Sequence, residues 1–171
     1  MANSNQQASQ GVLIVTGAGR GIGAAVAKLA GKRGFRVAVN YARNAQAAAE
    51  VARHIVSSGG RATVIQADIS REEEIVRLFE YVERELGPIT GLVNNAGITG
   101  GFARVEAVTS ATLTQVFAVT VIGAMLCARE AVRRMSTGNG GRGGAIVNIS
   151  SRAAEIGGQG NGYTMRRQRA H

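Results

Sequence analysis

Short apolar runs alternate with longer segments of helical periodicity along this chain. Short runs rich in β-branched side chains are typical of strands that are buried on both faces of a parallel sheet. The pattern predicts five strands, at residues 11–16, 35–40, 61–67, 89–93 and 145–150.

Four segments between these runs have the spacing of helices. They comprise residues 22–33, residues 45–57, a segment from Ser70 to Gly87, and residues 110–135. Ser70 is predicted to cap the third helix, because three glutamates follow it in the first turn, where the helix dipole favours carboxylates. The fourth helix is apolar on most faces and is expected to be largely buried.

The alternation of strands and helices predicts the fold. Strands joined by helices of ten or more residues require a parallel sheet with right-handed crossovers. We therefore expect a doubly wound α/β (Rossmann) domain over residues 11–160, with strand order 3-2-1-4-5 and a ligand crevice between the first and fourth strands. Residues 1–10 are polar and are expected to form a disordered tail.

The composition narrows the class of protein. A chain of 171 residues is long enough for one domain with a core. Its polar N-terminus lacks the features of a secretory signal, and no apolar run is expected to reach the length of a membrane helix. The single cysteine, Cys127, excludes an internal disulfide and a cysteine-rich metal site. The expectation is a cytoplasmic protein without a metal or a membrane partner.

The chain is basic, with 20 lysines and arginines against 11 acidic residues and a net charge of +9. The basic residues are interpreted as spread along the chain and interleaved with acids, apart from Arg166, Arg167 and Arg169 at the very end. Because there is no Trp and there are only three Tyr and four Phe, few side chains are available to stack on bases, so nucleic acid is disfavoured as a partner. A solvated basic surface that attracts an anionic cofactor is the favoured interpretation.

A glycine-rich turn joins the first strand to the first helix. It reads T-G-A-G-R-G-I-G over residues 16–23. Glycines at such a turn permit positive φ and let the backbone approach a pyrophosphate, which rests on the N–H groups of the helix N-terminus. The context of strand, turn and helix predicts a dinucleotide site.

Three motifs together resemble the classical short-chain dehydrogenase/reductase family. They are T-G-x-x-x-G-x-G at residues 16–23, N-N-A-G at residues 94–97 and I-V-N-I-S-S at residues 146–151. The similarity covers about residues 12–158. It implies a Rossmann fold, a nicotinamide cofactor, and hydride transfer between that cofactor and a small alcohol or carbonyl substrate.

The resemblance also implies positions for the cofactor. The residues expected at the pyrophosphate are Gly17, Gly21, Ile22 and Gly23. Those expected to bracket the adenine are Asp68 and Ile69. Those expected beneath the ribose and nicotinamide are Asn95, Ala96 and Gly97.

The end of the second strand favours NADP over NAD. An NAD enzyme usually has an acidic residue there, which accepts a hydrogen bond from the ribose 2′-OH. This chain has Asn40 followed by Arg43, and no carboxylate before Glu50. Arg20 and Arg43 are expected to pair with a 2′-phosphate, and Asn40 is predicted to lie at the cofactor.

The catalytic residues that the resemblance implies are incomplete. The family has a Tyr-x-x-x-Lys pair and a Ser after the fifth strand. Ser151 is the candidate for that Ser, and Ser150 is the alternative. Tyr163 is a weak candidate for the Tyr, because Arg167 stands four residues after it instead of Lys. Thr120 occupies the place where the family's long helix usually carries Asn.

Residues 161–171 change abruptly in character and are predicted to be an out-of-frame, disordered basic tail. One permitted set of codons, shifted by one base, reads E-W-V-H-Y-A-A-S-K-G-A, which contains the missing Tyr-x-x-x-Lys motif. Its Tyr codon straddles Thr164 and Met165. The expectation is a truncated and frameshifted family member that lacks the C-terminal strands.

Two functions follow from these interpretations. The first is an NADP-dependent oxidoreductase that is inactive as written. The alternative is a non-catalytic nucleotide-binding remnant. Family members are usually homo-oligomers that pack through the long helix and the helix after the fifth strand, and that second helix is absent from this sequence.

Overall fold

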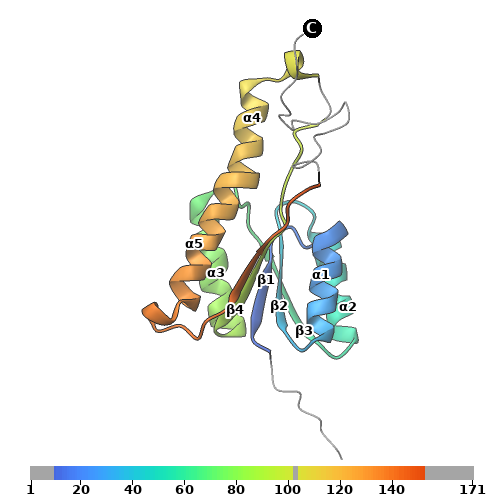
Figure 1. The fold of residues 1–171 in the computed structure, drawn as a ribbon. Coiled ribbons are helices and arrows are strands. Elements are labelled where there is room, and N and C mark those ends of the chain that lie inside the picture. The colour runs from blue at the N-terminus through green and yellow to red at the C-terminus, as the bar shows by residue number, and fades with distance from the viewer. Residues whose placement is uncertain (1–9, 102–103, 153–171) are drawn as a thin grey trace, which may run out of the picture.

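Five parallel strands form the centre of the computed structural model, which describes residues 10–101 and 104–152 (Figure 1). The strands are β1 (Val12–Val15), β2 (Arg36–Tyr41), β3 (Arg61–Gln66), β4 (Ile89–Asn94) and β5 (Ala145–Asn148). Their order in the sheet is β3-β2-β1-β4-β5, with every neighbouring pair parallel. This confirms the predicted doubly wound topology. The order reverses between β1 and β4. The connections that leave the carboxyl ends of these two strands therefore run in opposite directions, which opens a crevice between them.

Two layers of helices cover the sheet (Figure 1). The main helices are α1 (Gly21–Lys32), α2 (Ala45–Ser57), α3 (Glu72–Leu86), α4 (Ser110–Phe117) and α5 (Ala124–Met135). A π-helical segment, η2 (Ala118–Gly123), joins α4 to α5, and short 3-10 turns η1 (Val105–Ala107) and η3 (Thr137–Asn139) lie on either side of this long helix. Helices α1 and α2 cover one face, and α3 and α5 cover the other.

The core is divided by the sheet into two apolar clusters. On the side of α3 and α5, Ile14 and Leu92 of the strands pack with Phe79 of α3, all completely buried. On the side of α1 and α2, Val15 and Val39 pack against buried alanines of α1 and α2. Alternate residues of the same strands contribute to both clusters, as expected for strands that are buried on both faces.

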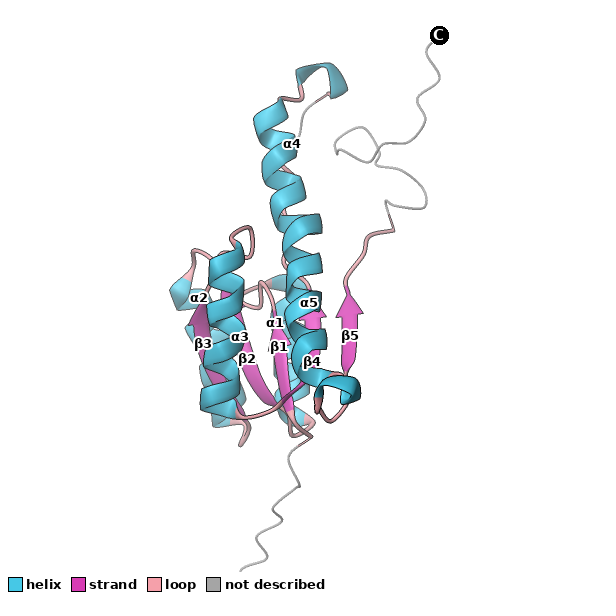
Figure 2. Cartoon of the chain, turned by 90° about the vertical axis from the view of Figure 1, so that its left-hand side faces the viewer, coloured by secondary structure: helices cyan, strands magenta, loops and turns pink. Residues whose placement is uncertain are grey.

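The prediction that the long helix is largely buried was wrong. No residue of α4 is buried, and the long helix exposes large apolar side chains (Phe117, Val121, Ile122, Met125 and Val132). Figure 2 shows the reason: the sheet and α3 flank only the α5 half, whereas the α4 half extends beyond the carboxyl ends of the strands. Helical periodicity identifies which positions are apolar. Whether these side chains are buried depends on a neighbouring element that packs against them.

The expectation that no apolar run reaches the length of a membrane helix was also wrong. Ser110–Met135 forms a continuous helix of 26 residues, whose most apolar 18-residue window has a mean hydropathy of 1.8, so it is long and apolar enough to cross a membrane. Only 11% of its most apolar window is buried. Length and composition alone are weak evidence for a membrane span, because core helices of other proteins pass the same test.

The start of α3 also differs from the prediction. The helix begins at Glu72, and Arg71 is its N-cap residue, with no side-chain cap. The Ser70 hydroxyl instead donates to the Asp68 carboxylate at 2.8 Å. The three glutamates of the first turn stabilise the N-terminus of this helix without a serine cap.

Candidate cofactor site

A cavity of about 650 Å³ opens where β1, β2 and β4 end. Nine of the predicted cofactor residues line it: Gly17, Arg20, Gly21, Ile22, Arg43, Asp68, Asn95, Ala96 and Gly97. Three predicted residues do not line it: Gly23, Asn40 and Ile69. A volume of this size is typical of a site for a small molecule or cofactor.

The glycine-rich turn presents free backbone donors to this cavity. Gly17 and Gly21 have φ values of 62° and 55°, in the region that glycine adopts most readily. The N-cap residue of α1, Arg20, supplies no side-chain hydrogen bond, and the first turn of α1 contains no acidic residue. The N–H groups at this helix N-terminus are therefore available for an anion.

The turn is held in place by the N-N-A-G segment after β4. The Thr16 hydroxyl donates to the Val93 carbonyl at 3.3 Å and accepts from the backbone N–H groups of Asn95 and Ala96, both at 3.0 Å. The Asn95 amide in turn donates to the carbonyls of Thr16, at 2.9 Å, and Gly17, at 3.1 Å. The two motifs that define the site are thus one hydrogen-bonded unit.

Gly23 has a packing role in this unit. A Cβ at this position would lie 2.4 Å from the Asn95 Nδ2 and 2.7 Å from the Gly17 carbonyl oxygen. Only a glycine allows α1 to approach the N-N-A-G segment so closely. Gly23 therefore shapes the cavity without lining it.

Asn40 is buried and is used inside the protein. Its Nδ2 donates to the carbonyls of Ile65, at 3.3 Å, and Ala67, at 3.1 Å, and its Oδ1 accepts from the Gly17 N–H at 3.2 Å. The side chain is 2% exposed. Asn40 thus joins the glycine turn to β3 and supports the site without lining the cavity.

Two arginines stand at the cavity without a carboxylate partner. Among the described residues, every ion pair involves Arg71 or a later arginine, so Arg20 and Arg43 form none. Residues 1–67 contain eight lysines and arginines but only one acidic residue, Glu50. The interpretation that basic and acidic residues are interleaved is therefore wrong for this part of the chain.

Asp68 and Ser70 form the wall of the cavity near α3. Asp68 Oδ1 accepts from the Ser70 N–H at 3.0 Å, and Glu74 Oε2 accepts from the Asp68 N–H at 2.8 Å. Ile69 points the other way, because it is 4% exposed and belongs to the core beneath α3 and α5. The pair expected to bracket the adenine is thus divided between the cavity and the core.

Nine further residues line the cavity that the sequence motifs did not predict: Gly19, Tyr41, Ala42, Asn44, Ala47, Ser70, Ile98, Gln115 and Val119. Most are neighbours of predicted positions in the sequence. Gln115 and Val119 come from the long helix, and no local signal identifies them. Thr120 also faces this region, because a Cβ at Gly97 would be 3.9 Å from its Oγ1.

The region after β5 supplies no lining residue in the described part of the chain. Asn94 Nδ2 donates to Asn148 Oδ1 at 2.9 Å and to the Ala124 carbonyl at 3.0 Å, which ties β4 to β5 and to the long helix. Ser150 and Ser151 follow at the same edge of the sheet and are exposed. Tyr163 and residues 161–171 lie outside the described residues.

Comparisons with known proteins agree with this geometry. The sequence profile of the family described as short chain dehydrogenase matches residues 11–163. An uncharacterized oxidoreductase of Escherichia coli, YgfF, is 47% identical over 149 residues, which are 87% of this chain and 60% of the relative. The versicolorin reductase stcU of Emericella nidulans is 38% identical over 155 residues, which are 91% of this chain and 56% of the relative.

A solved structure shows the same architecture. A double mutant of a Serratia marcescens short-chain dehydrogenase/reductase superimposes with a TM-score of 0.79 at 32% identity, over 86% of this chain and 58% of that one. The chain therefore spans somewhat more than half the length of the relatives that it matches.

Proposed function

Because the chain belongs to the short-chain dehydrogenase family, we propose that it is the cofactor-binding part of an oxidoreductase that uses NADP and acts on a small alcohol or carbonyl compound. The observation that carries this proposal is the uncapped N-terminus of α1, held by Thr16 and Asn95 at the wall of a cavity of about 650 Å³. Relatives named versicolorin reductase support a small-molecule substrate.

The residues present fit a dinucleotide. The uncapped turn offers backbone N–H groups to a pyrophosphate, and Gly21 leaves open space, since a Cβ there would have no neighbour within 4 Å. The family binds NAD or NADP, and the nicotinamide of the bound cofactor supplies or accepts the hydride. The residues of this chain would hold the phosphates and orient the adenosine between Arg43 and Asp68. The N-N-A-G backbone would lie beneath the ribose and nicotinamide of the cofactor.

The charges at the cavity favour NADP over NAD. Arg20 and Arg43 line it and have no carboxylate partner among the described residues, and Asp68 is the single acidic residue in its lining. A guanidinium forms charge-assisted, often bidentate, hydrogen bonds to phosphate, whereas the acid that would accept from a 2′-OH is absent from the end of β2.

We expect the protein to bind NADPH more tightly than NADH, and Arg43→Asp to abolish or reverse this preference. The variant should lose about 1–3 kcal/mol of binding free energy for NADPH, the magnitude of a charge-assisted pair. Titration of cofactor fluorescence measures both dissociation constants. Arg53→Asp makes the same change of charge at an exposed site on α2 outside the cavity, and it should leave the preference unchanged. Equal affinities in the unsubstituted protein would refute the proposed selectivity.

A further inference from the structure

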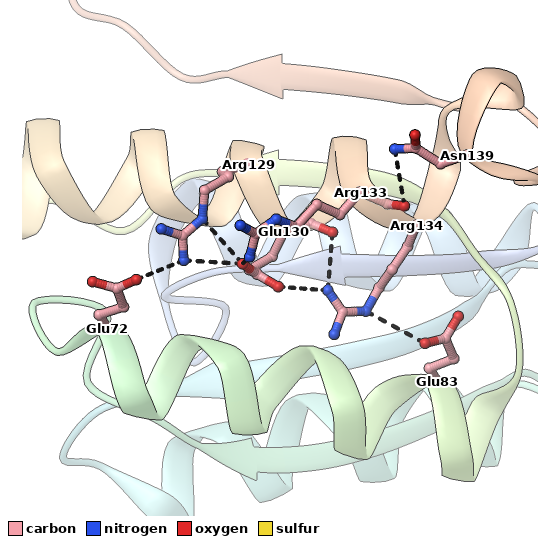
Figure 3. Close-up of polar contacts among 7 residues, drawn as sticks. All are labelled: Glu72, Glu83, Arg129, Glu130, Arg133, Arg134 and Asn139. Atoms are coloured by element: carbon pink, nitrogen blue, oxygen red, sulfur yellow. Dashed lines mark hydrogen bonds and ion pairs between the residues drawn. The ribbon is translucent and has the colours of Figure 1, made fainter.

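A cluster of charged residues joins α5 to α3 (Figure 3). Its centre is the Glu130 carboxylate, whose side chain is 3% exposed. Arg133 Nη1 donates to Glu130 Oε1 at 2.8 Å, and Arg134 Nη1 donates to Oε2 at 2.6 Å. Arg129 donates to Oε1 through Nε at 3.1 Å. A buried carboxylate requires such partners, because an unpaired buried charge is costly.

Arg129 connects this buried carboxylate to the beginning of α3. Its Nη2 lies 2.8 Å from Glu72 Oε1 and 3.0 Å from Glu130 Oε1. Glu72 is the first residue of α3. Because its guanidinium is planar and is already held by Glu130, Arg129 presents Nη2 to Glu72 in a defined direction.

The first turn of α3 is also bonded to the wall of the cavity. Glu74, two residues after Glu72, accepts from the backbone N–H of Asp68 at 2.8 Å. Asp68 in turn accepts from the N–H and the hydroxyl of Ser70. Asp68 and Ser70 both line the cavity. The contacts therefore run without a break from buried Glu130, through Arg129 and the first turn of α3, to the cavity.

The other arginines of the cluster do not contact the first turn of α3. Arg133 contacts the Glu130 carboxylate, and its side chain is 61% exposed. Arg134 reaches Glu83 at 3.3 Å, on a later turn of α3 far from Asp68 in the sequence. Arg129 is thus the member of the cluster that contacts the turn next to the cavity.

We propose that Arg129 is a positioning residue of the cofactor site, which holds Glu72, the first turn of α3 and hence the Asp68–Ser70 wall in the geometry that binds the adenosine end of the cofactor. This inference rests on the proposed function, since it concerns the same cavity. Arg129 and Glu72 do not line the cavity, so they act on the ligand through α3.

The test compares matched pairs of neutralised side chains. Glu72→Gln should raise the Kd for NADPH about three- to tenfold, in the range of coupling through packed elements. Glu73→Gln is its control: Glu73 is the next residue of α3, is similarly exposed, and pairs with Arg71. Arg129→Gln should raise the Kd for NADPH by the same factor as Glu72→Gln. Arg133→Gln, which also removes a partner of Glu130, should leave this Kd unchanged.

A second ligand locates the effect on the cofactor. The Kd for 2′,5′-ADP, which contains only the adenosine end, should rise by the same factor as that for NADPH.

The double variant identifies the contact itself. If Arg129 acts through Glu72, Glu72→Gln combined with Arg129→Gln should weaken NADPH binding no more than either change alone. An unchanged Kd in Glu72→Gln, a similar increase in Glu73→Gln, or additive effects in the double variant would each overturn the proposal. Glu72 is largely exposed, so its variant tests the inference even if Arg129→Gln does not fold. Failure of the unsubstituted protein to bind NADPH or NADH would instead reject the proposed function.

Discussion

Asn40 shows how one buried amide supports a binding site that it does not line. Three of its hydrogen bonds join the glycine turn to the end of β3, and each replaces a contact with water that the backbone has lost. The end of the second strand predicts a residue near the cofactor, but it does not predict the direction of that side chain. The direction follows from the pairing of β2 with β3, which places Asn40 beside Ile65.

We expect Asn40→Ala to lower the free energy of unfolding by about 1–3 kcal/mol, because it leaves buried donors and acceptors without partners. Urea unfolding followed by circular dichroism measures this change. Gln46→Ala is a suitable control, since the Gln46 side chain bonds only to exposed Glu50 and its loss should cost less than about 0.5 kcal/mol. An unchanged free energy of unfolding in Asn40→Ala would contradict this structural role.

At the scale of elements, the contact between α3 and α5 depends on the charge of Glu130. Burial raises the pKa of Glu130, but hydrogen bonds from Arg134 and Arg129 outweigh burial and hold the pKa below its usual range. A carboxyl whose pKa is lower in the folded state stabilises the fold above its unfolded pKa of about 4.3. That contribution is lost as the pH falls through the folded pKa.

We therefore expect the free energy of unfolding to decrease on acidification below about pH 4.3, and to decrease less steeply in Glu130→Gln. At neutral pH the same variant should be less stable by about 3 kcal/mol, because it leaves the arginines without their shared carboxylate. Denaturant titrations at a series of pH values give both quantities. Glu80→Gln is an exposed change on α3 that removes no ion pair among the described residues, so it should leave the slope unchanged. Identical slopes for the unsubstituted protein and Glu130→Gln would contradict this account.

The elements differ in how far the sequence predicts them. The strand order and the layers follow from the alternation of apolar runs and helical segments, because few topologies connect such elements. The exposure of α4 does not follow, since it depends on whether a neighbour covers Phe117 and Ile122. The π-helical segment, which contains the lining residue Val119 and follows Gln115 of α4, depends on how the long helix packs at Gly123. A Cβ there would lie 2.2 Å from the Ile69 carbonyl oxygen.

At the scale of the whole molecule, we propose that the 171-residue chain has little or no dehydrogenase activity. The 171 residues contain no Tyr-x-x-x-Lys pair, since Tyr163 is followed four residues later by Arg167. Loss of a positioned general acid typically lowers the rate by about 10²- to 10⁴-fold. A frameshift near residue 160 stays a prediction, which the nucleotide sequence of the gene around that codon tests.

The protein read in the shifted frame, and extended to the natural stop of the gene, should recover NADPH-dependent reduction. Both proteins would be assayed on a panel of small ketones and quinones by the consumption of NADPH. Binding without turnover by the extended protein would favour the nucleotide-binding remnant. Robust turnover by the 171-residue chain that is lost on Tyr163→Phe would show that Tyr163 is the catalyst and that the frame is correct.

The bonds between Thr16 and the N-N-A-G segment also bear on the order of folding. They join residues 77 to 80 positions apart, so the glycine turn gains these partners only after β4 has docked beside β1. Closing so long a loop is a late and slow event compared with forming a local helix. During synthesis, the turn is complete only once residue 96 has left the ribosome. Retention of a nascent chain by an immobilised nucleotide would therefore mark the moment at which the centre of the sheet closes.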